Sequence, residues 1–266
     1  MTDNAGVIQR FSQAARPPVI VVSLVAMGGL TTLFLLSAPP DVGTGHSGHG
    51  VPAAGLTAAR IAVFLVTWTA MSAAMMLPSA LSLLLAIERA AQGRSRAAML
   101  PVLAGLAYLL VWAIVGVAIL LIGEAARLYV HPLLGAQARN WVNGSCLVAA
   151  GLFGLSDFAS SCLRACRRPF GFLARHWRGG DDVAFQVTRI GLAYGLSCVG
   201  CCVPMLAMMF VIGMANIALV VAMAALMAVI KSSIWGVQVA RALSFAAMGA
   251  GLATGLGWLQ LADHFH

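Results

Sequence analysis

The chain has 266 residues, of which 61% are hydrophobic and 9% charged, and its mean hydropathy is +0.93. About a quarter of the residues of a soluble domain are charged, so this composition excludes an ordinary soluble protein and makes a lipid bilayer the main solvent. We attribute the net charge of +8 to basic cytoplasmic loops rather than to nucleic-acid binding. The six cysteines do not indicate a disulfide framework, because several lie inside hydrophobic runs.

Residues 1–59 are expected to form an N-terminal anchor helix and an outer loop. Arg10 and Arg16 precede an apolar run of about 20 residues, long enough to span a bilayer and too long for the core of a cleaved signal peptide. The glycine-rich loop that follows contains His46 and His49. Short histidine-containing tracts bind metals, although exposed loop histidines are also ordinary, so this pair is a secondary metal candidate.

Residues 60–262 are expected to fold as an all-α, polytopic transmembrane helix bundle. With the anchor, the chain has about seven stretches that are long and apolar enough to cross the hydrocarbon of a bilayer. These spans are placed at residues 17–38, 60–87, 99–122, 141–160, 187–213, 215–231 and 235–261.

The distribution of basic residues predicts the orientation of this bundle. A cytoplasmic N-terminus places thirteen of the sixteen Lys and Arg residues on the cytoplasmic side and leaves Arg60, Arg127 and Arg139 outside. Because positive charge concentrates in cytoplasmic loops, the sequence predicts a cytoplasmic N-terminus, an odd number of spans and an outer C-terminus.

The span at residues 60–87 contains the first group of sulfur side chains. Met71 and Met75 are one helical turn apart, and Met76 is adjacent. Pro78 cannot donate a backbone hydrogen bond, so the helix is expected to break beside these methionines. These three methionines are candidate metal ligands, and their other interpretation is core packing.

A second group lies at the inner end of the span at residues 141–160. Cys162 and Cys166 are one turn apart and are followed by Arg167 and Arg168. Neighbouring arginines favour the thiolate, which is the form that binds metals, but they also serve as topology determinants. The two cysteines are secondary metal candidates at a cytoplasmic access or exit point.

The strongest signal is a run of sulfur side chains in the span at residues 187–213. Three thiols fall within five residues, and thioethers follow at helical spacing: Cys198, Cys201, Cys202, Met205 and Met209. Pro204 is expected to bend the helix among them. The alternative interpretation is close helix packing, for which Gly191 and Gly195 supply small residues at a spacing of four.

Soft thiolate and thioether ligands select Cu(I), whereas zinc would more often recruit histidine or carboxylate as well. The primary metal candidates are Met71, Met75, Met76, Cys198, Cys201, Cys202, Met205 and Met209. The motifs of nucleotide-binding loops and of Ser-His-Asp hydrolases do not occur, so we predict no enzymatic activity, no catalytic residues and no organic cofactor.

Three motifs resemble the bacterial predicted metal-binding integral membrane proteins. These are Trp68 to Ser79, Cys162 to Phe172, and Tyr194 to Cys202 with the later Gly213, Met214 and Asn216. The resemblance implies a multi-pass protein of the bacterial cytoplasmic membrane that binds metal. The chain differs from the family pattern at Ile230, where relatives carry glutamate before the equivalent of Lys231.

The favoured hypothesis is therefore a membrane protein that binds Cu(I) for transport or for delivery to a membrane cuproenzyme. A second hypothesis is a non-catalytic accessory or assembly subunit of a larger membrane enzyme complex, in which sulfur side chains only pack helices. A third is a membrane thiol oxidoreductase using Cys201 and Cys202. An adjacent pair forms a strained disulfide, which makes this the weakest of the three.

Overall fold

The computed structural model describes residues 57–92, 97–130, 132–178, 182–212 and 217–258. Every regular element in these ranges is helical, which agrees with the predicted all-α class. In chain order they are α4 (Ala58–Ala90), α5 (Met99–Ala125), the π-helical turn η1 (Ala126–Val130), α6 (Ala136–Leu155), α7 (Asp157–Arg167), α8 (Pro169–His176), α9 (Val183–Ile212), α10 (Ile217–Ser232) and α11 (Gly236–Gly255). The predicted anchor helix at residues 17–38 lies outside the described residues.

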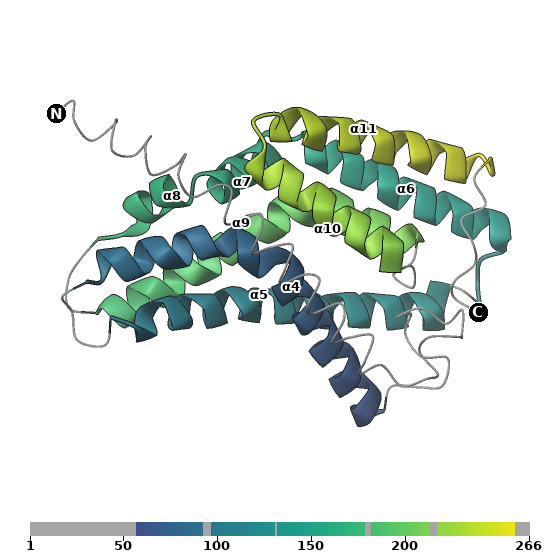
Figure 1. The fold of residues 1–266 in the computed structure, drawn as a ribbon. Helices are drawn as coiled ribbons and strands as arrows, with labels where there is room; N and C mark the ends of the chain where they lie inside the picture. The colour runs from purple at the N-terminus through teal and green to yellow at the C-terminus, as the bar shows by residue number, and fades with distance from the viewer. Residues whose placement is uncertain (1–56, 93–96, 131, 179–181, 213–216, 259–266) are drawn as a thin grey trace.

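The helices form two groups that meet at α9 (Figure 1). Helix α5 packs against both α4 and α9, while α6 and α11 lie side by side, and α9 also contacts α6 and α7. Small residues allow these close approaches. A Cβ atom on Gly191 would overlap the carbonyl oxygen of Ala104 in α5, and one on Gly195 would lie 3.0 Å from Val111 Cγ2. The predicted packing role of the two glycines is therefore confirmed.

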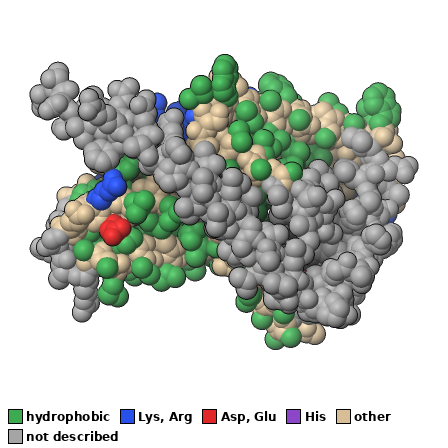
Figure 2. All heavy atoms as spheres, viewed as in Figure 1, with side chains coloured by type: hydrophobic (Ala, Val, Ile, Leu, Met, Phe, Trp, Pro, Cys, Tyr) green, Lys and Arg blue, Asp and Glu red, His purple; other side chains and the backbone are tan. Residues whose placement is uncertain are grey.

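Helix α5 is apolar on the side that faces away from the protein. Leu106, Leu110 and Ile114 follow one another at intervals of four and are 53–60% exposed, whereas Tyr108 and Trp112 are 1% exposed on the inner side. Figure 2 shows hydrophobic side chains spread over much of the described surface. A helix that exposes its large aliphatic side chains suits a lipid environment, where apolar surface carries no hydration cost.

Two described helices, α5 and α9, are by themselves long and apolar enough to cross a membrane. The number rises to four if each of two bent helix pairs counts as one crossing, and α10 contributes only a shorter apolar helix. These lengths and compositions support membrane character. The total of about seven spans and the orientation of the termini stay predictions.

Two breaks determine which side chains meet inside the bundle. The segments Ile61–Leu77 and Ser79–Ala90 of α4 meet at 71°, on either side of Pro78, so the predicted break there is confirmed. The predicted span at residues 141–160 is instead divided at Ser156, where α6 and α7 meet at 63°. The Ser156 hydroxyl accepts a hydrogen bond from the Ala159 amide at 3.2 Å and thereby caps α7.

Helix α9 behaves differently from α4. It continues from Val183 to Ile212 with Pro204 inside it, and residues 183–209 form one span without a break of the size found in α4. The expected bend at Pro204 stays a prediction, and it does not reach the size of the break in α4. The ring of Pro204 lies beside Gly154 of α6, where an added Cβ would be 2.7 Å from Pro204 Cγ. Close packing against a neighbouring helix holds this part of α9 in place.

Candidate metal centre

Helix α9 supplies three thiols at one level of the bundle. Cys198 and Cys202 are one turn apart and fully buried, and Cys201 between them is half-buried. The Cys201 thiol donates to the Cys198 carbonyl oxygen at 3.1 Å, and the sulfurs of Cys201 and Cys202 are 3.8 Å apart. All of these cysteines are free thiols. One face of α9 thus concentrates soft donor atoms in an apolar interior.

Helix α7 adds a fourth thiol from a distant part of the sequence. The turn at Ser156 directs α7 against α9, so that the sulfur of Cys166 lies 3.8 Å from that of Cys201. Together Cys166, Cys198 and Cys201 form a group whose three sulfur atoms all lie within 4.8 Å of one another. We call these three residues the thiol cluster.

The close approach of α7 to α9 depends on a glycine between the cluster cysteines. An added Cβ on Gly200 would lie 2.7 Å from Cys162 Sγ and 3.4 Å from an edge carbon of Phe158. Cys162 is thus buried against the backbone of α9, one turn before Cys166 on α7. It packs the interface between these helices, and its sulfur is not one of the three that form the cluster.

Side chains from three other helices contact Cys198. The Tyr108 hydroxyl of α5 donates to Cys198 Sγ at 3.1 Å. The ammonium nitrogen of Lys231, at the end of α10, lies 3.2 Å from the same sulfur, 3.1 Å from Ser79 Oγ and 3.3 Å from Met76 Sδ. Met76 Sδ is also 4.0 Å from Cys198 Sγ. A hydrogen-bonded, positively charged environment of this kind stabilises a negatively charged sulfur.

Three further hydrogen bonds attach the cluster to its neighbours. The Tyr194 hydroxyl of α9 donates to the Cys166 carbonyl oxygen at 3.1 Å, which links α9 to α7. The Arg167 guanidinium donates to the carbonyl oxygens of Ile230 at 2.8 Å and Ser233 at 2.6 Å. Since Arg167 follows Cys166 and Ile230 precedes Lys231, the ends of α7 and α10 are held together beside the thiols. The cluster therefore has a supporting shell of hydrogen bonds.

The spacing of the three sulfurs suits a single soft metal ion. Metal–thiolate bonds of about 2.3 Å place two sulfurs about 4 Å apart around a trigonal ion. The separations in the cluster, 3.8 Å between Cys166 and Cys201 and no more than 4.8 Å overall, are close to that requirement. The cluster contains neither histidine nor carboxylate, so its chemistry is that of a sulfur-only site.

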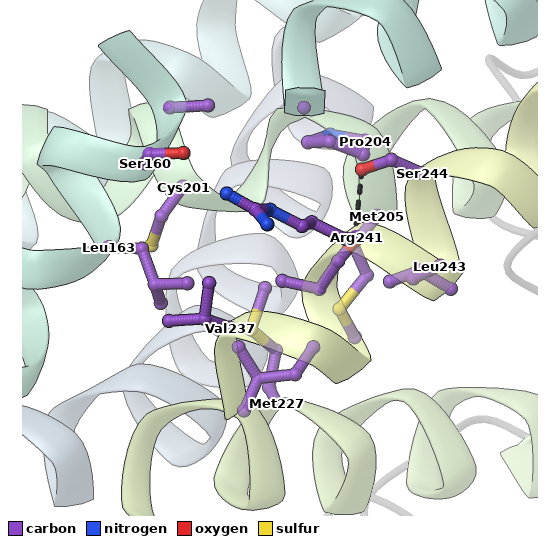
Figure 3. A pocket seen from close by; sticks show the side chains of 14 residues that line it. Ser160, Leu163, Cys201, Pro204, Met205, Met227, Val237, Arg241, Leu243 and Ser244 are labelled. Carbon is purple, nitrogen blue, oxygen red and sulfur yellow. Dashed lines mark hydrogen bonds between the residues drawn. The ribbon is translucent and has the colours of Figure 1, made fainter. Parts of the chain in front are cut away.

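A small cavity opens beside the cluster and is lined by residues of α6, α7, α9, α10 and α11 (Figure 3). Its volume is about 30 Å³, and its lining includes Cys201, the thioethers of Met205 and Met227, the Ser160 hydroxyl and Arg241. Room for a water molecule requires at least about 10–15 Å³, so the cavity accepts water or a bare ion. Cys201 belongs both to the thiol cluster and to the cavity lining, and it connects the two.

The predicted methionine ligands have different environments. Met76 lies next to Cys198, and Met205 lines the cavity. Met209 is buried at 4% exposure, while Met71 and Met75 are only partly buried and pack against the hydrophobic core. The structure brings a methionine of α4 and the thiols of α9 together, as the sequence suggested, but the nearest one is Met76. His46 and His49 lie outside the described residues.

Two members of the site were missed by sequence reasoning. The distribution of basic residues places Lys231 among the cytoplasmic charges, and none of the sequence motifs singles out Tyr108. A usable signal was present for both, because polar groups within apolar helices are costly and need partners. Lys231 lies in the last turn of the apolar helix α10, and Tyr108 lies within the most hydrophobic described helix, α5.

Comparison with known proteins agrees with the assignment of the thiol cluster as a candidate metal centre. Neither a curated protein nor a solved structure matches the chain at a significant level. Residues 65–254, which include the thiol cluster, Met76, Tyr108 and Lys231, match the family described as PpoB2, copper chaperone. This match covers well over half of the chain, and the family description agrees with the soft-metal chemistry of three clustered thiols. The chain therefore belongs to the PpoB2 family of copper chaperones.

Proposed function

We propose that this protein holds Cu(I) inside a membrane through Cys166, Cys198 and Cys201 and passes it to a membrane cuproenzyme. The observation that carries the proposal is the convergence of three thiols from two helices within 4.8 Å of one another. Thiolates are soft ligands and select Cu(I). The copper-chaperone family and the outward apolar face of α5 support copper as the metal and the bilayer as the location.

In this role the protein carries the ion without catalysing a reaction. Met76 Sδ, 4.0 Å from Cys198 Sγ, is positioned as a weaker thioether ligand. The half-buried Cys201 is the most accessible thiol of the cluster, since Cys166 and Cys198 are 5% and 0% exposed. A site with one accessible thiol suits a carrier, which must bind copper tightly and still release it by ligand exchange.

The matched pair Cys166→Ala and Cys162→Ala tests this proposal. Both variants remove one buried thiol from α7, but only Cys166 belongs to the cluster. The detergent-purified proteins are loaded with Cu(I), their copper content is measured, and a chromophoric Cu(I) chelator competes for the ion. Wild type and Cys162→Ala should hold one Cu(I) per chain, with only sulfur neighbours in X-ray absorption, and Cys166→Ala should lose affinity by about tenfold or more.

Three results would contradict the proposal. Equal retention of copper by both variants would remove Cys166 from the site. Absence of copper from the wild type, together with a stably co-purifying enzyme, would favour the accessory-subunit role. A disulfide that forms and is reduced reversibly among these cysteines, without metal binding, would favour the oxidoreductase role.

A further inference from the structure

The cavity beside the thiol cluster contains an arginine that the site itself does not use. Arg241 of α11 extends its guanidinium across the cavity towards Cys201 and Ser160 (Figure 3). Within the described residues it has neither a hydrogen bond nor an ion pair, and it is exposed. By contrast, Arg167 on the facing helix donates to two carbonyl oxygens. Arg241 is thus a free cation at the accessible side of the cluster.

The permanent positive charge of Arg241 affects which form of copper is attracted to Cys201. Arginine stays protonated under all ordinary conditions, and its planar group of donors fits a carboxylate in a two-point contact. A bare Cu(I) ion approaching Cys201 would be repelled by this charge, whereas an anionic complex would be attracted. The cavity, at about 30 Å³, accepts the ion but excludes the body of a carrier molecule.

Building on the proposed function, we propose that Cu(I) reaches Cys201 through this cavity as a complex with a small, carboxylate-bearing thiol, which Arg241 binds. The carboxylate of the carrier is held at Arg241 while its copper–thiolate end faces the cavity. The thiol of Cys201 then replaces the carrier thiolate. The bond between copper and the carrier sulfur breaks, a bond to Cys201 Sγ forms, and the Cys201 proton goes to the departing thiolate. No electron is transferred, and copper remains Cu(I) throughout.

The cavity lining fits this transfer. The Ser160 hydroxyl of α7 lies on the same side as Cys201 (Figure 3), and the thioethers of Met205 and Met227, each 2% exposed, belong to the same lining. Thioethers bind Cu(I) more weakly than thiolates do and therefore do not trap an ion that belongs on the cluster. Arg241 first binds the carboxylate of the carrier, and Cys201 then receives the copper.

The experiment compares loading rates from two carriers of opposite charge. Detergent-purified wild type and Arg241→Gln are mixed with Cu(I)–glutathione, which is anionic, or with Cu(I)–cysteamine, which has an ammonium and no carboxylate. Arg241→Gln should load about tenfold more slowly from glutathione, with the difference shrinking at high salt, and at least as fast from cysteamine. Its final copper content and affinity should equal those of the wild type, and Arg241→Lys should recover part of the rate.

Arg175→Gln is the matched control, because it removes an exposed positive charge on α8 that does not line the cavity. Equal loading rates for wild type and Arg241→Gln from both carriers would overturn the inference and leave the copper site intact. A loss that occurs only when anionic lipid is added would assign Arg241 to headgroup binding and would also overturn it. If the wild type takes up no copper at all, the proposed function itself fails. That outcome differs from equal loading rates, which would leave the copper site intact.

Discussion

The contact between α5 and α9 gives the sharpest test of the fold, through Gly191→Ala. The added Cβ would overlap the carbonyl oxygen of Ala104 and would lie 3.0 Å from Ala104 Cα and Ala107 Cβ. Carbon atoms pack best at about 3.5–4.0 Å, so the two helices must separate by about 0.5–1 Å. Such a gap forfeits a quarter to a half of the contact energy there, and overpacking of this kind costs about 1–3 kcal/mol. Backbone atoms make the contact, so no side-chain rotation relieves it.

Gly249→Ala in α11 is the matched control, because an added Cβ there meets nothing within 4 Å. It keeps only the helix-propensity gain of Gly→Ala, about 0.5–1 kcal/mol. A difference of about 2 kcal/mol between the variants corresponds to about 4–8 °C in Tm for a chain of this size. Thermal unfolding in detergent, followed by circular dichroism, should therefore place Gly191→Ala clearly below both the control and the wild type. Equal Tm values for the two variants would refute the described packing of α5 on α9.

Three further changes test the shell around the thiols. Arg167→Gln removes two charge-assisted hydrogen bonds to carbonyl oxygens, so the Tm of this variant should fall by several degrees. Arg168→Gln is its control, because it removes an exposed neighbouring charge, and its Tm should stay within about 2 °C of the wild type. Tyr108→Phe removes the hydroxyl that donates to a cluster sulfur and should lower stability by about 0.5–1.5 kcal/mol in the same assay; an unchanged Tm would show that this bond is not formed. Met76→Leu should weaken Cu(I) binding several-fold in chelator competition, whereas Met75→Leu should not, because the Met76 sulfur lies 4.0 Å from that of Cys198. The reverse order would favour the ligand set centred on Met75.

The sequence predicted the helices and the location of the chemistry because both are encoded locally. Apolar runs of sufficient length marked the helices, and Pro78 marked the break in α4 that the structure has at 71°. The motif at Cys198–Cys202 identified α9 as the helix that carries the thiols, since three cysteines in one turn and a half need no tertiary information. Cys166 was recognised as a secondary candidate by its neighbouring arginines.

The assignment of particular partners required the packed structure. Met71, Met75 and Met76 are neighbours on one helix, and the rotation of α4 against α5 and α9 decides that Met76 faces Cys198. A count of basic residues placed Lys231 among cytoplasmic charges, but its ammonium lies beside Met76 and Cys198 because α10 ends there. Residues far apart along the chain interact through packing geometry, and no local pattern encodes that geometry.

By itself, therefore, the sequence determined that the protein is helical and strongly apolar and that its chemistry is that of sulfur. Hydrophobicity and residue type act locally and can be read from the chain directly. Only the tertiary structure decided that α7, turned at Ser156, delivers Cys166 to the thiols of α9. A metal centre depends on atoms a few ångströms apart, and the meeting of distant helices sets such distances.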